Sequence, residues 1–203
     1  MTRIDYWRDG FDWRAQEARL NSFPQYKVSL QGIDLHFMHV LGNGPDPHPL
    51  LLSHGWPGSV FEFLELIPRL TDPGRFGADP ADAFPVVVPS LPGLSFTSGQ
   101  ARLGLEAIVD CFAELMTDVL DYKRFGAQGG DWGSWTVARL GLAYPERMSG
   151  LHLNMMPGAV TRRGYSLARQ RRAATLRSSG PGGRRDAVIS GFKVLGPRRP
   201  PLL

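Results

Sequence analysis

Short apolar runs alternate with helical periodicities from Lys27 to Asn154, and this alternation limits the fold to a few choices. Residues 28–40 alternate apolar and polar side chains around Gln31-Gly32, which predicts a β-hairpin. Further strands are predicted at 50–52, at 85–89, just before Gly129 and at 151–153, and helices at 60–70, 105–119 and 132–144. Strands that alternate with helices form a mostly parallel sheet that helices cover on both faces. The sequence therefore predicts an α/β fold.

The composition is that of a globular protein: 42% of the 203 residues are hydrophobic and 21% are charged. The chain has neither an apolar run of the roughly 20 residues that a membrane helix needs nor a signal-peptide pattern. A single cysteine, Cys111, excludes an intrachain disulfide framework and offers no zinc cluster. We therefore expect no transmembrane segment, no metal site, no cofactor and a reducing, cytoplasmic location.

The charge is divided unevenly along the chain. Residues 161–203 carry 11 basic residues and one acidic residue, whereas residues 1–160 carry 12 basic and 18 acidic residues. The basic segment is rich in Arg, Gly and Pro and has no sustained period, which predicts a disordered tail. Such a tail favours nucleic acid or an anionic surface as an alternative function. Specific nucleic-acid binding by the tail is disfavoured, because within residues 161–203 only Tyr165 and Phe192 offer aromatic rings for base stacking.

The sequence GGDWGS at residues 129–134 lies between a predicted strand and a predicted helix, which is the context of a nucleophile elbow. Asp131 takes the place of Ser in the pattern G-x-S-x-G, and Gly129 and Gly133 are the small residues that relieve crowding in the bend. An Asp that attacks a saturated carbon leaves an ester, which an activated water can cleave. Asp131 is thus predicted to be the nucleophile for an epoxide or an alkyl halide. The alternative is that Asp131 only caps the following helix.

A second motif, HGWPGS at residues 54–59, follows an earlier predicted strand. A hydrolase elbow holds the oxyanion with two backbone N–H groups. Here they belong to Trp132, which follows the nucleophile, and to Trp56 in the earlier strand-to-helix loop. The remaining residues of interest in this motif are structural ones: His54, Gly55 and Pro57. As alternatives, the histidine is a satisfied core residue and the proline a first-turn proline.

Together the two motifs resemble the signature loops of the α/β-hydrolase-fold epoxide hydrolases, in particular the microsomal and juvenile-hormone type with its bacterial relatives. The resemblance extends over most of residues 5–160 and is supported by the sequences at 6–14, 26–37 and 89–93. It implies an α/β-hydrolase fold that is incomplete at its C-terminal side. The implied regions are the end of the family's N-terminal region at 1–26, the first half of the hydrolase domain at 27–160 and an unrelated tail at 161–203.

The resemblance implies a hydrolase that converts a small-molecule epoxide into a vicinal diol through an ester on Asp131, in detoxification or aromatic hydrocarbon catabolism. It also implies that Trp56 and Trp132 are the oxyanion donors and that the peptide bond before Pro57 is cis. A haloalkane dehalogenase, which also uses an Asp elbow, is the alternative enzyme. The strings YWR at 6–8 and FDWR at 11–14 favour the epoxide branch.

In that family, two cap tyrosines protonate the leaving oxygen, and a late histidine with its acid activates water. Only His152 follows the elbow, and we expect it to be a packed strand residue, so no general base is found. The other late candidates are Asp186 and Tyr165, both in the tail. We therefore expect an N-terminal fragment without turnover. Its tail is expected to come from a shifted reading frame, with a genuine extension as the alternative.

Overall fold

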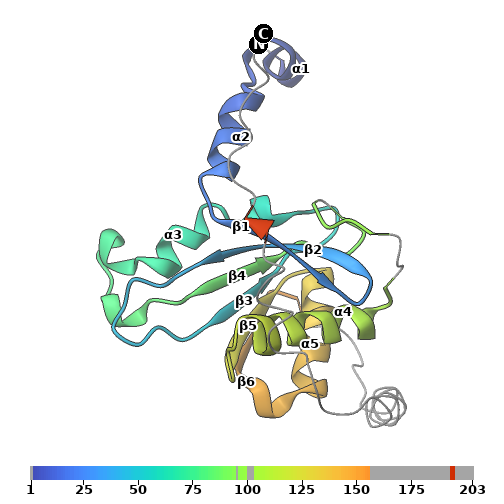
Figure 1. Cartoon of the computed structure of the whole chain (residues 1–203). Helices are drawn as coiled ribbons and strands as arrows, with labels where there is room; N and C mark the ends of the chain where they lie inside the picture. Colours follow the sequence, from blue (N-terminus) through green and yellow to red (C-terminus); the bar gives the residue numbers. More distant parts are fainter. Residues whose placement is uncertain (1, 95, 100–102, 156–192, 195–203) are drawn as a thin grey trace.

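The computed structural model describes residues 2–94, 96–99, 103–155 and 193–194. A central sheet carries helices on both faces, and the N-terminal helices project away from it (Figure 1). The tail predicted at 161–203 lies outside the described residues apart from Lys193 and Val194. Among the described residues, none of the helices has the length and apolar character needed to cross a membrane.

Seven strands form the sheet in the order β6-β5-β3-β4-β2-β1-β7. Their bounds are Gln25–Leu30 (β1), Ile33–Val40 (β2), Leu50–Ser53 (β3), Val86–Pro89 (β4), Phe125–Gly129 (β5), Met148–Leu153 (β6) and Lys193–Val194 (β7). The expected parallel arrangement holds from β4 through β3 and β5 to β6. The strands β2, β1 and β7 add antiparallel pairs, so the sheet is mixed.

The predicted hairpin is confirmed. Strands β1 and β2 pair antiparallel, with Leu30 opposite Ile33, across a turn of two residues. Both turn residues have positive φ, 53° at Gln31 and 79° at Gly32. Positive φ at both central residues defines the tight turn whose twist matches that of a hairpin. A link of two residues can join only antiparallel strands, which accounts for the mixed character of the sheet.

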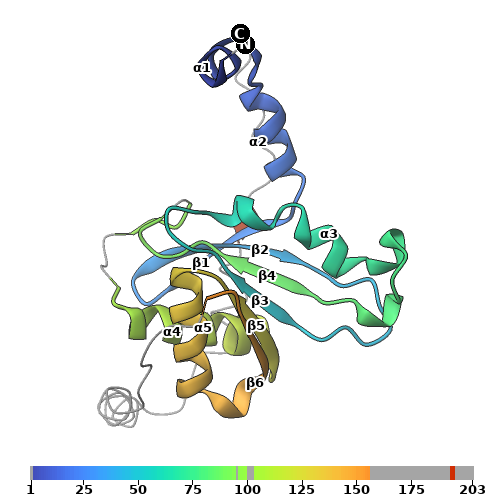
Figure 2. The ribbon, with the colours of Figure 1, turned by 180° about the vertical axis from the view of Figure 1, so that it is seen from behind.

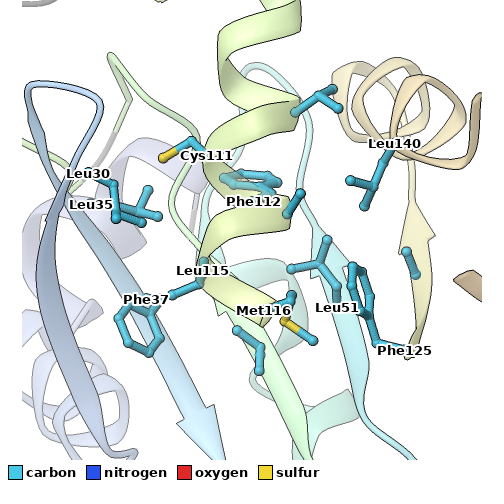
Figure 3. Packing of buried hydrophobic residues seen from close by; sticks show 14 of the residues in the cluster. Leu30, Leu35, Phe37, Leu51, Cys111, Phe112, Leu115, Met116, Phe125 and Leu140 are labelled. Atoms are coloured by element: carbon cyan, nitrogen blue, oxygen red, sulfur yellow. The ribbon is translucent and has the colours of Figure 1, made fainter. Parts of the chain in front are cut away.

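Both faces of the inner strands are apolar, because successive side chains of a strand point to opposite sides. In β3, Leu51 belongs to one core cluster and Leu52 to the other. The larger cluster lies against α4 (Leu105–Glu114) and α5 (Trp132–Ala143), and Phe112 lies near its centre (Figure 3). The smaller cluster contains residues of η2 (Val60–Phe63) and α3 (Leu66–Thr71), on the opposite face of the sheet (Figure 2).

The helix predicted across residues 60–70 is interrupted. A 3-10 turn, η2 (Val60–Phe63), precedes a short helix, α3 (Leu66–Thr71). Pro68 explains the break, because proline has no N–H and is tolerated only in the first turn of a helix. The helix predicted at 105–119 is α4 continued by a π-helical turn, η5 (Leu115–Val119). The short turns η3 (Pro73–Phe76), η4 (Pro80–Asp82) and η6 (Pro145–Arg147) complete the connections.

The N-terminal region consists of α1 (Arg3–Asp5), a π-helical turn η1 (Tyr6–Gly10) and α2 (Trp13–Asn21). Only the end of α2 packs on the body, where Leu20 joins the smaller core cluster. The side chain of Arg19 also pairs with Glu65 before α3. The rest of this region stands away from the sheet (Figure 2). Its aromatic side chains, Tyr6, Trp7, Phe11 and Trp13, are exposed.

Strand β6 forms one edge of the described sheet and pairs only with β5 there. Four of its six residues are exposed, among them Leu151 and His152. The expectation that His152 is packed is therefore wrong: its side chain lies on an edge strand whose outer side has no cover among the described residues.

Candidate active site

Asp131 occupies a sharp bend between β5 and α5. Its backbone has φ 51° and ψ −123°, a conformation that residues other than glycine rarely adopt. The hydroxyl Oγ of Ser134 donates to the carbonyl of Gly129 at 2.8 Å, which ties the first turn of α5 back to the end of β5. A backbone held in such a conformation by its surroundings is characteristic of functional sites.

The glycines on either side of the bend are required by close backbone contacts. A Cβ atom at Gly129 would overlap the carbonyl of Gly133, and one at Gly133 would overlap the carbonyl of Ser53 at the end of β3. Ser53 lies beside Gly129 in the parallel register of β3 and β5. This register brings the loop after β3 next to Asp131.

The Asp131 carboxylate is held from the loop after β3. The backbone N–H of Trp56 donates to Oδ1 of Asp131 at 2.8 Å, whereas the Asp131 side chain makes no capping bond to α5. The interpretation of Asp131 as a helix cap therefore does not fit. The N–H groups of Trp56 and, next in effect, Trp132 lower the pKa of this exposed carboxyl below its usual value.

Gly55 lets this loop approach Asp131. A Cβ atom at Gly55 would stand 2.6 Å from Cβ and 2.7 Å from Oδ1 of Asp131. The peptide bond between Trp56 and Pro57 is cis, as the resemblance implied. Pro57 lies in the turn ahead of η2, which begins at Val60, so it is not a first-turn proline.

His54 is a satisfied core residue rather than a reactive one. Its side chain is fully buried, and Nε2 accepts the Leu91 N–H at 3.0 Å while Nδ1 lies 2.9 Å from the carbonyl of Gly55. A backbone N–H can only donate, so Nδ1 carries the proton and donates to Gly55. Burial lowers the pKa of His54, whereas the Gly55 carbonyl and the Glu62 charge act in the opposite direction.

Two polar residues near the elbow escaped the sequence interpretation. The Asn154 N–H donates to the Gly129 carbonyl at 3.1 Å, and Nε2 of Gln128 donates to Oδ1 of Asn154 at 3.3 Å. Both residues lie at the carboxyl ends of parallel strands, where open α/β sheets bind their ligands. Their place at the carboxyl ends of the strands could have marked both residues as site candidates, but it can be recognised only once the strand order is known.

In the described part of the chain, the Asp131 carboxylate has no side-chain partner that could activate water. Among the described residues, no imidazole is hydrogen-bonded to Asp131, and no cluster of His, Cys, Asp or Glu side chains is suited to hold a metal ion. The late candidates Tyr165 and Asp186 lie outside the described residues.

Sequence comparison assigns the chain to a family. Residues 48–176 match the family described as alpha/beta hydrolase fold, and residues 1–63 match the one described as epoxide hydrolase N terminus. The chain thus belongs to the α/β-hydrolase fold family, and its first part has the N-terminal region of epoxide hydrolases.

Individual relatives agree with this assignment. The chain is 40% identical to epoxide hydrolase 1 of Oryctolagus cuniculus, over 81% of this chain and 37% of the relative. It is 36% identical to juvenile hormone epoxide hydrolase 1 of Ctenocephalides felis, over 75% of this chain and 33% of the relative. The crystal structure of juvenile hormone epoxide hydrolase from Bombyx mori superposes with a TM-score of 0.67 at 36% identity, over 75% of this chain and 40% of that one.

The resemblance to epoxide hydrolases and the α/β-hydrolase fold are confirmed by these matches. The chain spans about a third of the length of the curated relatives it matches.

Proposed function

We propose that this chain is an epoxide hydrolase in which the Asp131 carboxylate opens the epoxide ring. The observation that carries the proposal is the hydrogen bond of 2.8 Å from the Trp56 N–H to Oδ1 of Asp131. This bond favours the ionised carboxylate and occupies one oxygen, so that Oδ2 is the oxygen offered to substrate.

In the proposed reaction, Oδ2 forms a bond to one ring carbon, and the bond from that carbon to the ring oxygen breaks. The electron pair moves to the ring oxygen, which then takes up a proton. Water next adds to the carboxyl carbon of the ester, and Oδ1 becomes an oxyanion next to the N–H groups of Trp56 and Trp132. Collapse of this intermediate breaks the bond from the carboxyl carbon to Oδ2, so that Oδ2 leaves with the substrate as an alcohol oxygen and the water oxygen takes its place in Asp131. The water gives up two protons: one goes to the leaving alcohol oxygen, and the other replaces the proton taken up by the ring oxygen. The products are a vicinal diol and the restored carboxylate.

The surroundings of the carboxylate support an apolar substrate. Trp56 and Trp132, the two residues whose N–H groups face the carboxylate, are 60% and 53% exposed. Tryptophan side chains offer a large apolar area, so two exposed tryptophans in the segments that bind the carboxylate favour apolar and aromatic substituents. We therefore propose an epoxide with an aromatic or apolar substituent as the substrate class.

We further propose that the 203-residue chain forms the ester but does not hydrolyse it quickly. Activation of water by a positioned base accelerates such a step by about 10²–10⁴-fold. The last histidine of the chain is His152, which makes no hydrogen bond to Asp131. The ester is accordingly expected to persist.

The experiment is incubation of the full chain with styrene oxide, followed by intact-protein mass spectrometry. We expect a mass increase equal to one styrene oxide molecule in the wild-type chain and none in Asp131→Asn. Asp121→Asn is the matched control, because Asp121 is also exposed and also has positive φ, 58°. A wild-type chain that stays unmodified while it is folded contradicts the proposal. Chloride release from a chloroalkane, without reaction of styrene oxide, supports the dehalogenase alternative.

A further inference from the structure

Two buried histidines hold consecutive residues of the loop that follows β4. Nδ1 of His36 lies 2.9 Å from Oγ of Ser90, and Nε2 of His54 accepts the N–H of Leu91 at 3.0 Å. His36, His54 and Ser90 are fully buried. The position of this loop is thus set from two sides, by β2 through His36 and by the end of β3 through His54.

The partners of His36 define its protonation. Nε2 of Gln25 donates to the Leu20 carbonyl at 3.1 Å, so Oε1 of Gln25 faces His36 and accepts from Nε2–H of the ring at 3.0 Å. Nδ1 is then an acceptor for the Ser90 hydroxyl. Burial, and after it the charge of Lys27, lower the pKa of His36 to about 4, which keeps the ring neutral near pH 7.

The contacts of His36 continue to the candidate nucleophile. Ser90 is followed by Leu91, whose N–H binds His54, and Nδ1 of His54 donates to the carbonyl of Gly55. The next N–H along the chain is that of Trp56, which holds Oδ1 of Asp131. Every link in this series is a hydrogen bond or a neighbouring residue. At its other end Gln25 binds the last turn of α2, so the series joins the N-terminal region to the site.

We propose that His36 is a positioning residue, which holds the Trp56 N–H against Asp131 through the loop after β4. The inference rests on the proposed function, because it concerns the group that acts as nucleophile there. Its test needs no substrate, so it is decided separately from the reaction with styrene oxide.

The test measures the backbone amide of Trp56 by NMR in the full chain near pH 7. A hydrogen bond to a carboxylate shifts the amide proton resonance downfield and protects the proton from exchange with solvent. Asp131→Asn identifies the part of the shift that the carboxylate causes. In Ser90→Ala, which removes a single oxygen atom, we expect Trp56 to lose about tenfold in protection and the resonance to move toward that of Asp131→Asn.

Two substitutions of His36 separate positioning from simple packing. The side-chain amide of Asn stands where Nδ1 of His stands, whereas that of Gln stands where Nε2 stands. His36→Asn retains a partner for Ser90, so the Trp56 amide should stay close to wild type. His36→Gln retains only the partner for Gln25 and should behave like Ser90→Ala.

Two controls report on the stability of the whole fold. Thr71→Val removes another buried hydroxyl, whose bond goes to Ile67 in α3. Thr71→Val should leave the Trp56 amide unchanged. The amide of Ala127 in β5 is the internal reference and should stay unchanged in every variant. An unchanged Trp56 amide in Ser90→Ala overturns the proposal, as does an equal loss of protection at Trp56 and Ala127. Should a His36 variant not fold, Ser90→Ala decides alone.

Discussion

The backbone beside Asp131 leaves no room for a side chain at Gly55, and a small change there tests the site directly. A methyl group at Gly55 would stand 2.6 Å from Cβ of Asp131, so Gly55→Ala must displace the carboxylate or the loop that holds it. We expect alkylation by styrene oxide to slow at least about tenfold, because a displaced nucleophile loses its alignment. The rate is measured by intact mass against time.

Gly150→Ala is the control for this substitution, because a Cβ at Gly150 meets nothing within 4 Å. It should react at the wild-type rate. Equal rates for Gly55→Ala and the wild type would mean that the close contact with Asp131 has no part in the reaction.

A second consequence at the residue scale concerns acid stability. The pKa of His36 is about 4 in the folded chain, below its ordinary value of 6.5, so the unfolded chain binds this proton more tightly. Its contribution to stability is therefore complete above about pH 6.5 and is lost as the pH falls toward 4. The loss amounts to about 3 kcal/mol once the pH is below 4.

Urea unfolding at a series of pH values checks this expectation. In His36→Asn, which has no titrating ring, the free energy of unfolding should fall less steeply between pH 6.5 and 4. The same slope in both proteins would show that His36 is not buried as a neutral ring.

At the scale of elements, α4 contributes several buried residues to the larger core cluster. Phe112 is fully buried between the sheet and α5, at the centre of the larger cluster (Figure 3). Phe112→Ala should lower the free energy of unfolding by about 3–5 kcal/mol, through lost burial and the cavity that remains. Denaturant titration measures the change, and Leu105→Ala, at a partly buried position at the start of the same helix, should cost clearly less. An equal loss of unfolding free energy in the two variants would show that Phe112 is not at the centre of the core.

Elements with a strong local pattern were predictable from the sequence. The hairpin turn, the apolar strands β3 and β4 and the helix α4 follow from spacing and turn chemistry alone. The prediction of one continuous helix over 60–70 was wrong, because Pro68 is tolerated only in the first turn of a helix, so that α3 starts shortly before it. The antiparallel pairing of β2 with β4 was not predicted, since strand order is a property of the whole chain.

In the candidate site, too, some features could be predicted from the sequence and others could not. The elbow and the facing loop were predictable, because each motif lies within six residues between recognisable elements. The bonds from His36 to Ser90 and from Asn154 to Gly129 join residues far apart in the sequence. No local pattern encodes such contacts, and they emerge only when the strands are set side by side.

At the scale of the whole molecule, the outer edge of β6 is a surface on which we expect other chains to associate. Among the described strands it is paired on one side only, and Leu151 is 45% exposed. An uncovered strand edge with apolar side chains promotes association with other chains. We expect the molar mass of the 203-residue chain to rise with concentration in light scattering, and Leu151→Lys to reduce the rise. A chain that stays monomeric at high concentration would contradict this.

If Asp131 is the nucleophile, the covalent label left by an epoxide lies on that residue, and the position of the label can be measured. The chain is incubated with styrene oxide and digested, and the modified residue is located by tandem mass spectrometry. We expect a single ester on Asp131, formed by the carboxylate that the Trp56 N–H binds. A label on Asp121, or one spread over several exposed carboxylates, would contradict it.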